Sequence, residues 1–149
     1  MAHEVERREL VRYLKEHDLK RTKQREAILD VFLSTGGHLT REEVLQAVRE
    51  LHSNIGYTTV YRTLKLLCAA GLASERHFDG GITRYEIDHD HHDHLVCVNC
   101  GEIIEFECEM IEASQNEIAE RYGFRILRHR HELYGHCAAC RSEAPPASL

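Results

Sequence analysis

Four of the six cysteines in the 149-residue chain fall in two closely spaced pairs. Cys97 and Cys100 form one C-x2-C pair, Cys137 and Cys140 form the other, and 36 residues separate the two pairs. Zinc binds four thiolates in a tetrahedron, and one C-x2-C turn brings two thiolates to the same ion. A redox-active dithiol and a disulfide pair are the alternatives, but two C-x2-C units favour a structural zinc site.

Imidazole and carboxylate side chains gather in a second group between residues 86 and 94. Its members are Glu86, His89, His91, His92, Asp93 and His94. If this segment is extended, side chains 92 and 94 point to one face and side chains 91 and 93 to the other, so that one strand can supply two sites. Mixed nitrogen and oxygen ligands suit Fe(II), Mn(II), Co(II) or Zn(II) and leave the ion exchangeable. The alternatives are a solvated polar hinge and a His-rich tract that binds metal nonspecifically.

A third group of side chains has the chemistry for contacting DNA. It lies on the polar side of an expected helix whose buried side carries Val60, Leu64 and Leu67. The polar side carries Thr58, Thr59, Tyr61, Arg62 and Lys65. Arginine can make two hydrogen bonds to guanine, and tyrosine or threonine can contact phosphate or a thymine methyl group. A basic stretch at Lys20, Arg21, Lys23 and Arg25 suits phosphate or minor-groove contact. The alternatives are a solvated helix face and an exposed turn.

The elements that position these side chains follow from periodicity and turn residues. We expect four helices. The first runs through about residue 17, the second begins after Thr22 and ends before the Gly36-Gly37 break, the third runs from Arg41 to about Leu51, and the fourth follows the turn SNIG and stops at Gly71. Thr40 and Glu43 form a capping box at the start of the third helix. The stretches LASERHF and ITRYEI, on either side of Asp79-Gly80-Gly81, predict a β-hairpin. Helix, turn, helix and hairpin in this order predict a winged helix.

The second half predicts a small α/β domain. Strands are expected in LVCVNC and EIIEFE, a helix from about Met110 to Arg121, and a third strand in FRILRHRHELYG. We therefore expect an α+β chain with a winged-helix domain at residues 1–87, a hinge at about 88–93, a dimerisation domain at 94–141 and a disordered tail at 142–149. Three strands and one helix form too small a core to stand alone, which favours a homodimer.

Charge is divided unevenly between the halves. Residues 1–84 carry 14 basic and 12 acidic side chains, a net charge of +2, whereas residues 85–149 carry 5 and 13, a net charge of −8, and hold seven of the 12 histidines. This division suggests a nucleic-acid module beside a cation-binding module. No apolar run is long enough for a membrane span, and no secretory signal is present, so we expect a cytoplasmic protein. No HExxH, GxSxG, P-loop or Rossmann pattern occurs, which disfavours an enzyme; a metal-dependent hydrolase or metal-storage protein is the alternative class.

The segments GYTTVYRTLKLL, HHDHLVCVNCGEIIEF and HELYGHCAAC together resemble the ferric uptake regulator family, over about residues 10 to 141. This resemblance implies a cytoplasmic homodimer that closes on an AT-rich palindromic DNA operator when metal is bound and represses transcription.

The resemblance also implies roles for particular residues. The structural zinc ligands would be Cys97, Cys100, Cys137 and Cys140. The regulatory ligands would be His38, Glu86, His92, His94 and Glu105, and an additional site would use His91, Asp93, Glu112 and His129. Tyr61 and Arg62 would face DNA, with Lys20 near the minor groove.

The resemblance bears on the regulatory metal as well. Glu105 and Arg62 are typical of the iron-responsive branch, whereas the short spacing from Glu86 to His92 resembles the peroxide-sensing branch. The zinc-, manganese- and nickel-responsive branches share most of the pattern. We predict Fe(II), with Mn(II), Co(II) or Zn(II) as possible substitutes.

Some candidate ligands have no predicted role. Cys68 lies in the apolar run LKLLCAAGL, where a buried thiol is expected. His131 falls on the same face as His129, but exposure is the simpler interpretation. The sequence assigns nothing to His89, His136 or Cys108.

Overall fold

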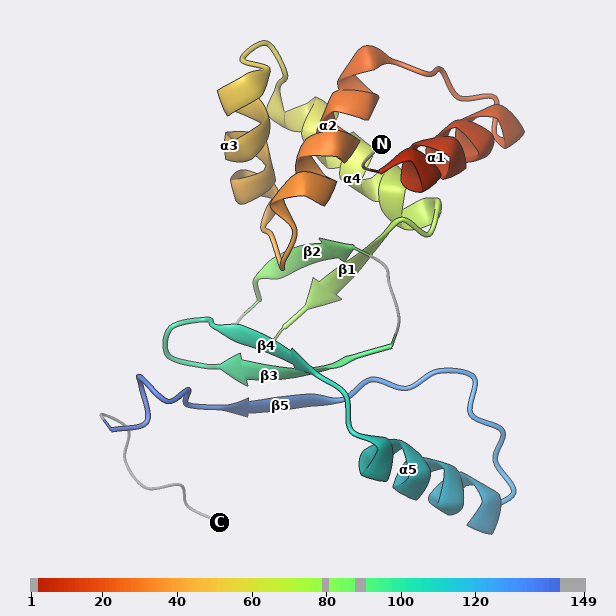
Figure 1. Ribbon diagram of the computed structural model, residues 1–149, viewed down its shortest axis with the longest axis vertical. Helices are drawn as coiled ribbons and strands as arrows, with labels where there is room; N and C mark the ends of the chain where they lie inside the picture. The colour runs from red at the N-terminus through yellow and green to blue at the C-terminus, as the bar shows by residue number, and fades with distance from the viewer. Residues whose placement is uncertain (1–2, 79–80, 88–90, 143–149) are drawn as a thin grey trace. The chain divides into compact units, whose positions relative to one another are not determined.

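A computed structural model describes residues 3–78, 81–87 and 91–142 of the chain (Figure 1). The chain divides into two compact units, Met1–His89 and Asp90–Leu149. Three predicted features lie outside the described residues: the hairpin-turn residues Asp79 and Gly80, the hinge at 88–90 with His89, and the tail at 143–149. Among the described residues, no helix is both long and apolar enough to cross a membrane.

In its described residues the first unit contains four helices and one hairpin, in the order that the sequence predicts. The elements are α1 (Glu4–Glu16), α2 (Lys23–Thr35), α3 (Arg41–Leu51), α4 (Tyr57–Ala69), β1 (Ala73–His77) and β2 (Thr83–Ile87). Helices α2, α3 and α4 pack against one another, and β1 packs against α4. The core is apolar and fully buried, with Leu10, Ile28, Phe32, Val48 and Leu64 at its centre. This order is that of a winged helix.

Local signals in the sequence set the ends of these helices. The predicted capping box is present, because the Thr40 hydroxyl accepts the Glu43 N–H at 3.2 Å and the Glu43 carboxylate accepts the Thr40 N–H at 2.7 Å. Helix α4 has no side-chain cap at its start and stops at Gly71, which has a φ of 71°. That left-handed conformation costs a glycine little, so Gly71 ends the helix and turns the chain into β1.

The hairpin is tied to the loop before α3. Strands β1 and β2 pair antiparallel, with Ser74 opposite Glu86 and Arg76 opposite Arg84. Leu39 and Tyr85 exchange two backbone hydrogen bonds of 2.9 and 2.7 Å. This bridge fixes the loop that carries His38 against β2.

The second unit is a three-stranded sheet with one helix. Its elements are β3 (Asp93–Cys97), β4 (Ile103–Phe106), α5 (Glu109–Arg121) and β5 (Glu132–Gly135). The strand order is β4-β3-β5, with β3 antiparallel to β4 and parallel to β5. Strand β3 begins at Asp93, the last residue of the expected hinge.

The expected third strand is shorter than predicted. Only residues 132–135 of FRILRHRHELYG form β5, and residues 124–131 are irregular. The prediction was wrong there because a strand needs a neighbour, and no strand in the described part of the chain pairs with residues 124–130. Only the His131 carbonyl oxygen reaches the sheet, where it accepts the His94 N–H at 3.2 Å. Phe124 and Leu127 in this segment are 76% and 86% exposed.

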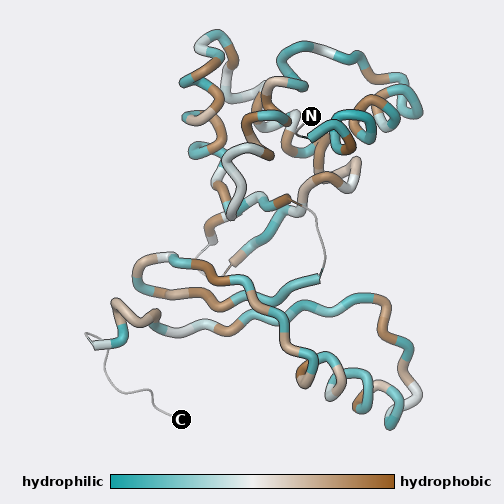
Figure 2. The backbone as a smooth tube through the Cα atoms, viewed as in Figure 1, coloured by the Kyte–Doolittle hydropathy of each residue, from teal (hydrophilic) through white to brown (hydrophobic). Residues whose placement is uncertain are grey.

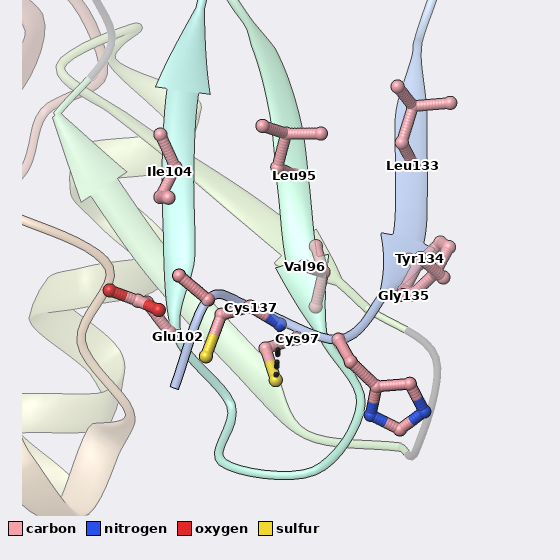
Figure 3. A pocket seen from close by; sticks show the side chains of 11 residues that line it. Leu95, Val96, Cys97, Glu102, Ile104, Leu133, Tyr134, Gly135 and Cys137 are labelled. Atoms are coloured by element: carbon pink, nitrogen blue, oxygen red, sulfur yellow. Dashed lines mark hydrogen bonds between the residues drawn. The ribbon is translucent and has the colours of Figure 1, made fainter. Parts of the chain in front are cut away.

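Apolar side chains also remain uncovered on the sheet. Leu95 in β3, Ile104 in β4 and Leu133 in β5 lie on adjacent strands and are 40–46% exposed. They line a hollow of about 420 Å³, shown in Figure 3. The tube in Figure 2 is brown along parts of these strands and of the segment after α5. An apolar face of this kind on so small a sheet indicates a surface that another chain covers.

Candidate metal sites and nucleic-acid interface

The four cysteines of the two C-x2-C pairs come together at one end of the second unit's sheet. Cys97 ends β3, and Cys137 follows β5, the parallel neighbour of β3. Because parallel strands end at the same edge, the turn after each strand carries its pair of thiols to the same place. All four sulfur atoms lie within 4.8 Å of one another, and those of Cys100 and Cys137 are 3.7 Å apart. Figure 3 shows Cys97 and Cys137 beside the hollow on the sheet.

The cluster has the dimensions of a zinc site, and one of its four thiols has a lowered pKa. Sulfurs bound tetrahedrally at about 2.3 Å from zinc are about 3.8 Å apart. Backbone N–H groups of Cys100 and Cys137 point at the Cys97 sulfur and lower its pKa to about 6. The Cys137 N–H lies 3.4 Å from that sulfur. Cys97 is therefore a thiolate at neutral pH, which is the form that binds metal. All six cysteines lie in the described part of the chain, and none is in a disulfide.

A second cluster of possible ligands lies within the same unit. Its members are His91, Asp93, Glu112 and His129. The Glu112 Oε1 atom of α5 lies 3.2 Å from His91 Nε2 and 3.1 Å from His129 Nε2. The Asp93 Oδ1 atom lies 3.4 Å and 3.8 Å from the same two nitrogens. Two imidazoles thus face two carboxylate oxygens at spacings that one divalent ion can bridge.

Asp93 is the clearest sign that this cluster needs a cation. Its side chain is 1% exposed, yet neither carboxylate oxygen has a hydrogen-bond partner among the described residues. Burying an ionised carboxylate without a partner is strongly unfavourable, and a bound cation removes that penalty. His131 adds one more nitrogen nearby, with Nδ1 4.0 Å from Asp93 Oδ2. The donor set of this cluster therefore fits a transition metal ion.

In the first unit, two of the regulatory candidates form a buried pair. The loop before α3 carries His38, whose Nε2 atom lies 2.7 Å from Oε2 of Glu86 in β2, and their side chains are 8% and 3% exposed. The Leu39–Tyr85 bridge sets this spacing, because it fixes residue 38 beside residue 86. Arg84 donates a hydrogen bond of 2.9 Å to the His38 carbonyl oxygen and holds the loop from the other side.

In the second unit, the other three regulatory candidates lie on one face of the sheet. His94 in β3 pairs directly with Glu105 in β4, so their side chains share a face. The rings of His92 and His94 are 4.8 Å apart, and His92 Nε2 lies 3.7 Å from Glu105 Oε1. Residues 92 and 94 thus contact one set of groups and residues 91 and 93 another, as alternation along the strand predicts.

The candidate DNA-contacting side chains lie along α4 and near the start of α2. Thr58, Arg62 and Lys65 are exposed, and Thr59 and Tyr61 are partly buried. A hollow of about 280 Å³ is lined by both regions, including Lys20, Arg25 and Arg62. The basic stretch near the start of α2 and the polar face of α4 therefore border the same hollow.

Two sets of contacts made by side chains of α4 could not be predicted from the sequence. The Arg41 guanidinium lies 5.1 Å from the Tyr61 ring centre and 6.0 Å from that of Tyr57. Arg41 begins α3, and sequence reasoning treated it only as a helix start. Lys65 forms an ion pair with Glu75 of β1, which couples α4 to the hairpin. Only tertiary structure brings these residues together, so no local pattern could indicate them.

A winged-helix unit joined to a unit with two clusters of metal-ligating side chains defines a metal-binding, DNA-binding regulator. Residues 16–134 match the ferric uptake regulator family. A ferric uptake regulation protein of Neisseria meningitidis is 43% identical over 132 residues, which are 87% of this chain and 92% of that protein. The chain therefore belongs to the ferric uptake regulator family of metal-dependent transcriptional regulators.

Solved structures agree with this assignment. The ferric uptake regulator of Helicobacter pylori, whose structure is described as revealing three functional metal-binding sites, has a TM-score of 0.84 and 35% identity, covering 92% of this chain and 91% of that one. The Vibrio cholerae regulator has a TM-score of 0.73 and 41% identity, covering 83% of this chain and 96% of that one. Both support the predicted α+β fold.

Proposed function

We propose that this protein is an Fe(II)-responsive transcriptional repressor that acts in the cytoplasm as a homodimer on an AT-rich palindromic operator. The observation that carries the proposal is that imidazole and carboxylate ligands occur in both units, with His38 and Glu86 beside the winged helix and His92, His94 and Glu105 on the sheet. An ion that uses ligands from both units makes the DNA-binding unit respond to metal.

The cysteine cluster serves a different purpose from the mixed clusters. Zinc held by Cys97, Cys100, Cys137 and Cys140 would be structural, because four thiolates hold the ion tightly and leave no open position. It would join the ends of β3 and β5. The group His91, Asp93, Glu112 and His129 would be an additional, more exchangeable site on the other side of β3.

The regulatory ion would act by differential binding. An ion that His38, Glu86, His92, His94 and Glu105 bind together favours whichever arrangement of the two units presents all of the ligands at once. Moving such an equilibrium from 1:99 to 99:1 requires a preference of about 5.5 kcal/mol. Five nitrogen and oxygen ligands suit Fe(II), with Mn(II), Co(II) and Zn(II) as substitutes. The N. meningitidis relative is named for ferric uptake.

Dimerisation would cover the exposed apolar side chains of the second unit. Residues 95, 104 and 133 on the sheet and Phe124 and Leu127 after α5 form the apolar surface that a second copy would bury. A second copy would also supply a neighbour for the irregular segment 124–131. Two copies then present two α4 helices to the half-sites of a palindrome, which matches the two-fold symmetry of the operator.

On the DNA, we assign different tasks to the two basic regions. Arg62 and Tyr61, with Thr58, Thr59 and Lys65, would contact bases and nearby phosphates in the major groove. Lys20 would enter or flank the minor groove, where the potential of AT-rich DNA is most negative. Arg41 would hold the Tyr61 ring in place through its cation–π contact.

The proposal is tested by His38→Ala, which removes one regulatory ligand. Fluorescence anisotropy of a labelled AT-rich palindrome is measured at fixed salt, with anaerobic Fe(II) or Mn(II) titrated into protein that retains its zinc. We expect the variant to remain dimeric and to lose the metal-dependent increase in DNA affinity. His17→Ala, at an exposed histidine of the same unit, is the matched control and should behave as wild type. DNA binding by the wild type that does not depend on metal would contradict the proposal.

A further inference from the structure

The Glu86 carboxylate is engaged at both oxygens by groups of its own unit. Oε2 lies 2.7 Å from His38 Nε2, and Oε1 accepts a hydrogen bond of 2.6 Å from Arg76 Nε. The Glu86 side chain is 3% exposed and that of Arg76 is 27% exposed. The buried Glu86 carboxylate therefore has a positively charged partner, Arg76, on the oxygen that does not contact His38.

The register of the hairpin places a positive charge at this position. Arg76 lies opposite Arg84, and Glu86 is two residues beyond Arg84 on the same strand, so all three side chains share one face. The two arginines have different partners, however. Arg84 contacts the His38 carbonyl oxygen at 2.9 Å and Glu43 at 3.4 Å, whereas Arg76 contacts the Glu86 carboxylate itself.

We propose that Arg76 is an internal counter-ion that sets the affinity of the regulatory site for its metal. This inference rests on the proposed function, in which Glu86 is a metal ligand. In the metal-free protein the guanidinium neutralises a carboxylate that is otherwise buried and charged. In the metal-bound protein the same guanidinium would repel a divalent cation held by the Glu86 carboxylate that it contacts.

Linkage gives the direction of the effect. Arg76 stabilises the metal-free state more than the metal-bound state, so its charge lowers metal affinity by the difference. Repulsion between a unit charge and a nearby divalent ion, even when water screens it, weakens binding by about tenfold. The hydrogen bond to Oε1 has a second effect, because it keeps Glu86 oriented with Oε2 toward His38. The two effects are separable, since one depends on charge and the other on a donor.

This arrangement would let the site fill and empty as the metal concentration changes, instead of staying occupied at all concentrations. A site whose carboxylates lack any counter-ion binds metal at the lowest concentrations and stays filled. With Arg76 in place, the empty state is stable, and the site fills only above a threshold. Arg76 would thus determine the metal concentration at which the repressor responds.

The test compares Arg76→Gln, which keeps an N–H donor and removes the charge, with Arg76→Lys, which keeps the charge. Mn(II) alone is titrated into the full-length, zinc-retaining protein against a competing chelator. A His129→Ala background removes binding at the additional site. We expect Arg76→Gln to bind Mn(II) about tenfold more tightly. Arg76→Lys should stay within about threefold of its parent, because the charge is retained.

Arg84→Gln is the matched control. Arg84 lies directly opposite Arg76 and carries the same charge, but its contacts are with His38 and Glu43 rather than with Glu86. We expect it to leave Mn(II) affinity unchanged or weaker, since Arg84 holds the His38 loop. Unchanged or weaker affinity in Arg76→Gln, with circular dichroism showing a folded protein, overturns the inference. So does an equal gain in Arg84→Gln. Should Arg76→Gln unfold, Arg76→Met removes the charge together with the donor, and Mn(II) binding by Arg76→Met no tighter than by Arg76→Lys then overturns the inference.

Failure of the proposed function would look different. Adding His38→Ala to the same background tests whether Mn(II) binds at this site at all. If that variant keeps the affinity of its parent, the regulatory site itself is absent. If it loses Mn(II) binding while Arg76→Gln changes nothing, the site exists and only the role of Arg76 is wrong.

Discussion

The sulfur atoms of Cys100 and Cys137 lie 3.7 Å apart although 37 positions separate the two residues in sequence. One belongs to the turn after β3 and the other follows β5, so their contact joins the two strands at the edge where both end. The sheet has only three short strands, and its apolar side chains are partly exposed. A metal ion at this junction would therefore contribute a large share of the stability of the second unit.

Replacing Cys137 by serine should release the zinc and unfold the second unit while leaving the first unit folded. Serine is a poor zinc ligand, and the remaining three thiolates cannot complete the tetrahedron. Zinc content and hydrogen exchange at the amides of β3 and β5 are the measurements. Cys108→Ser is the control, because this thiol lies in the same unit outside the cluster, and it should retain zinc. Protected β3 amides in a zinc-free Cys137→Ser protein would contradict this prediction.

The elements that the sequence predicted well are those that short-range rules determine. Thr40 and Glu43 indicate the start of α3, because a capping box is a contact between residues three positions apart. Gly71 indicates the end of α4, because the stop depends on the backbone conformation of that residue alone. The two C-x2-C pairs are equally easy to recognise in the sequence, and the structure brings their four sulfur atoms within 4.8 Å of one another.

The features that the sequence could not predict depend on contacts between distant residues. Nothing near Glu112 marks it as a partner of His91, and only the family resemblance assigned it. Arg76 meets Glu86 because of the hairpin register, which no pattern around residue 76 reveals. Residues 124–130 have the residue types of a strand but no partner among the described strands, so composition alone predicted too long an element.

Removing one imidazole from the additional site should lower the number of exchangeable ions by one per subunit. His129→Ala leaves Asp93 and Glu112 with a single histidine, and the remaining oxygen-rich set binds transition metals weakly. Equilibrium dialysis with Co(II), after zinc is loaded at the cysteines, counts the ions. His136→Ala removes an exposed histidine of the same unit that is not among the four residues of this cluster and should keep the wild-type number. Equal counts in both variants would mean that the cluster around Asp93 binds no ion.

Two basic residues should affect DNA binding in different ways. Arg62→Ala should cost about 1–3 kcal/mol on the specific operator and little on unrelated DNA, because it removes base contacts. Lys20→Ala should weaken binding to both and reduce the slope of log affinity against log salt by about one. Anisotropy titrations at several salt concentrations distinguish these outcomes. Arg8→Ala, at an exposed arginine of α1, is the control. Equal losses on specific and unrelated DNA for Arg62→Ala would count against base reading.

Loss of the α3 capping box should destabilise the first unit by about 1 kcal/mol. Thr40→Ala removes the acceptor for the Glu43 N–H, and the Glu43 carboxylate then caps alone. Urea unfolding of the metal-free protein, followed by circular dichroism, measures the change. Ser34→Ala at an exposed position of α2 should stay within about 0.5 kcal/mol of wild type. A similarly small change in Thr40→Ala would show that the box contributes little here.

The link between α4 and the hairpin should weaken in acid. Burial raises the pKa of Glu75, but hydrogen bonds from Lys65 and Tyr85 outweigh it and hold the pKa below its ordinary value. A carboxylate with a lowered folded-state pKa stabilises the protein above its unfolded pKa of about 4.3, and this contribution disappears as pH falls through the folded value. Glu75→Gln should therefore reduce the stability of the first unit at pH 7 and have a smaller effect near pH 3. Hydrogen exchange of the α4 amides in both proteins measures this difference, and an equal deficit at the two pH values would show that the charge of Glu75 is not its cause.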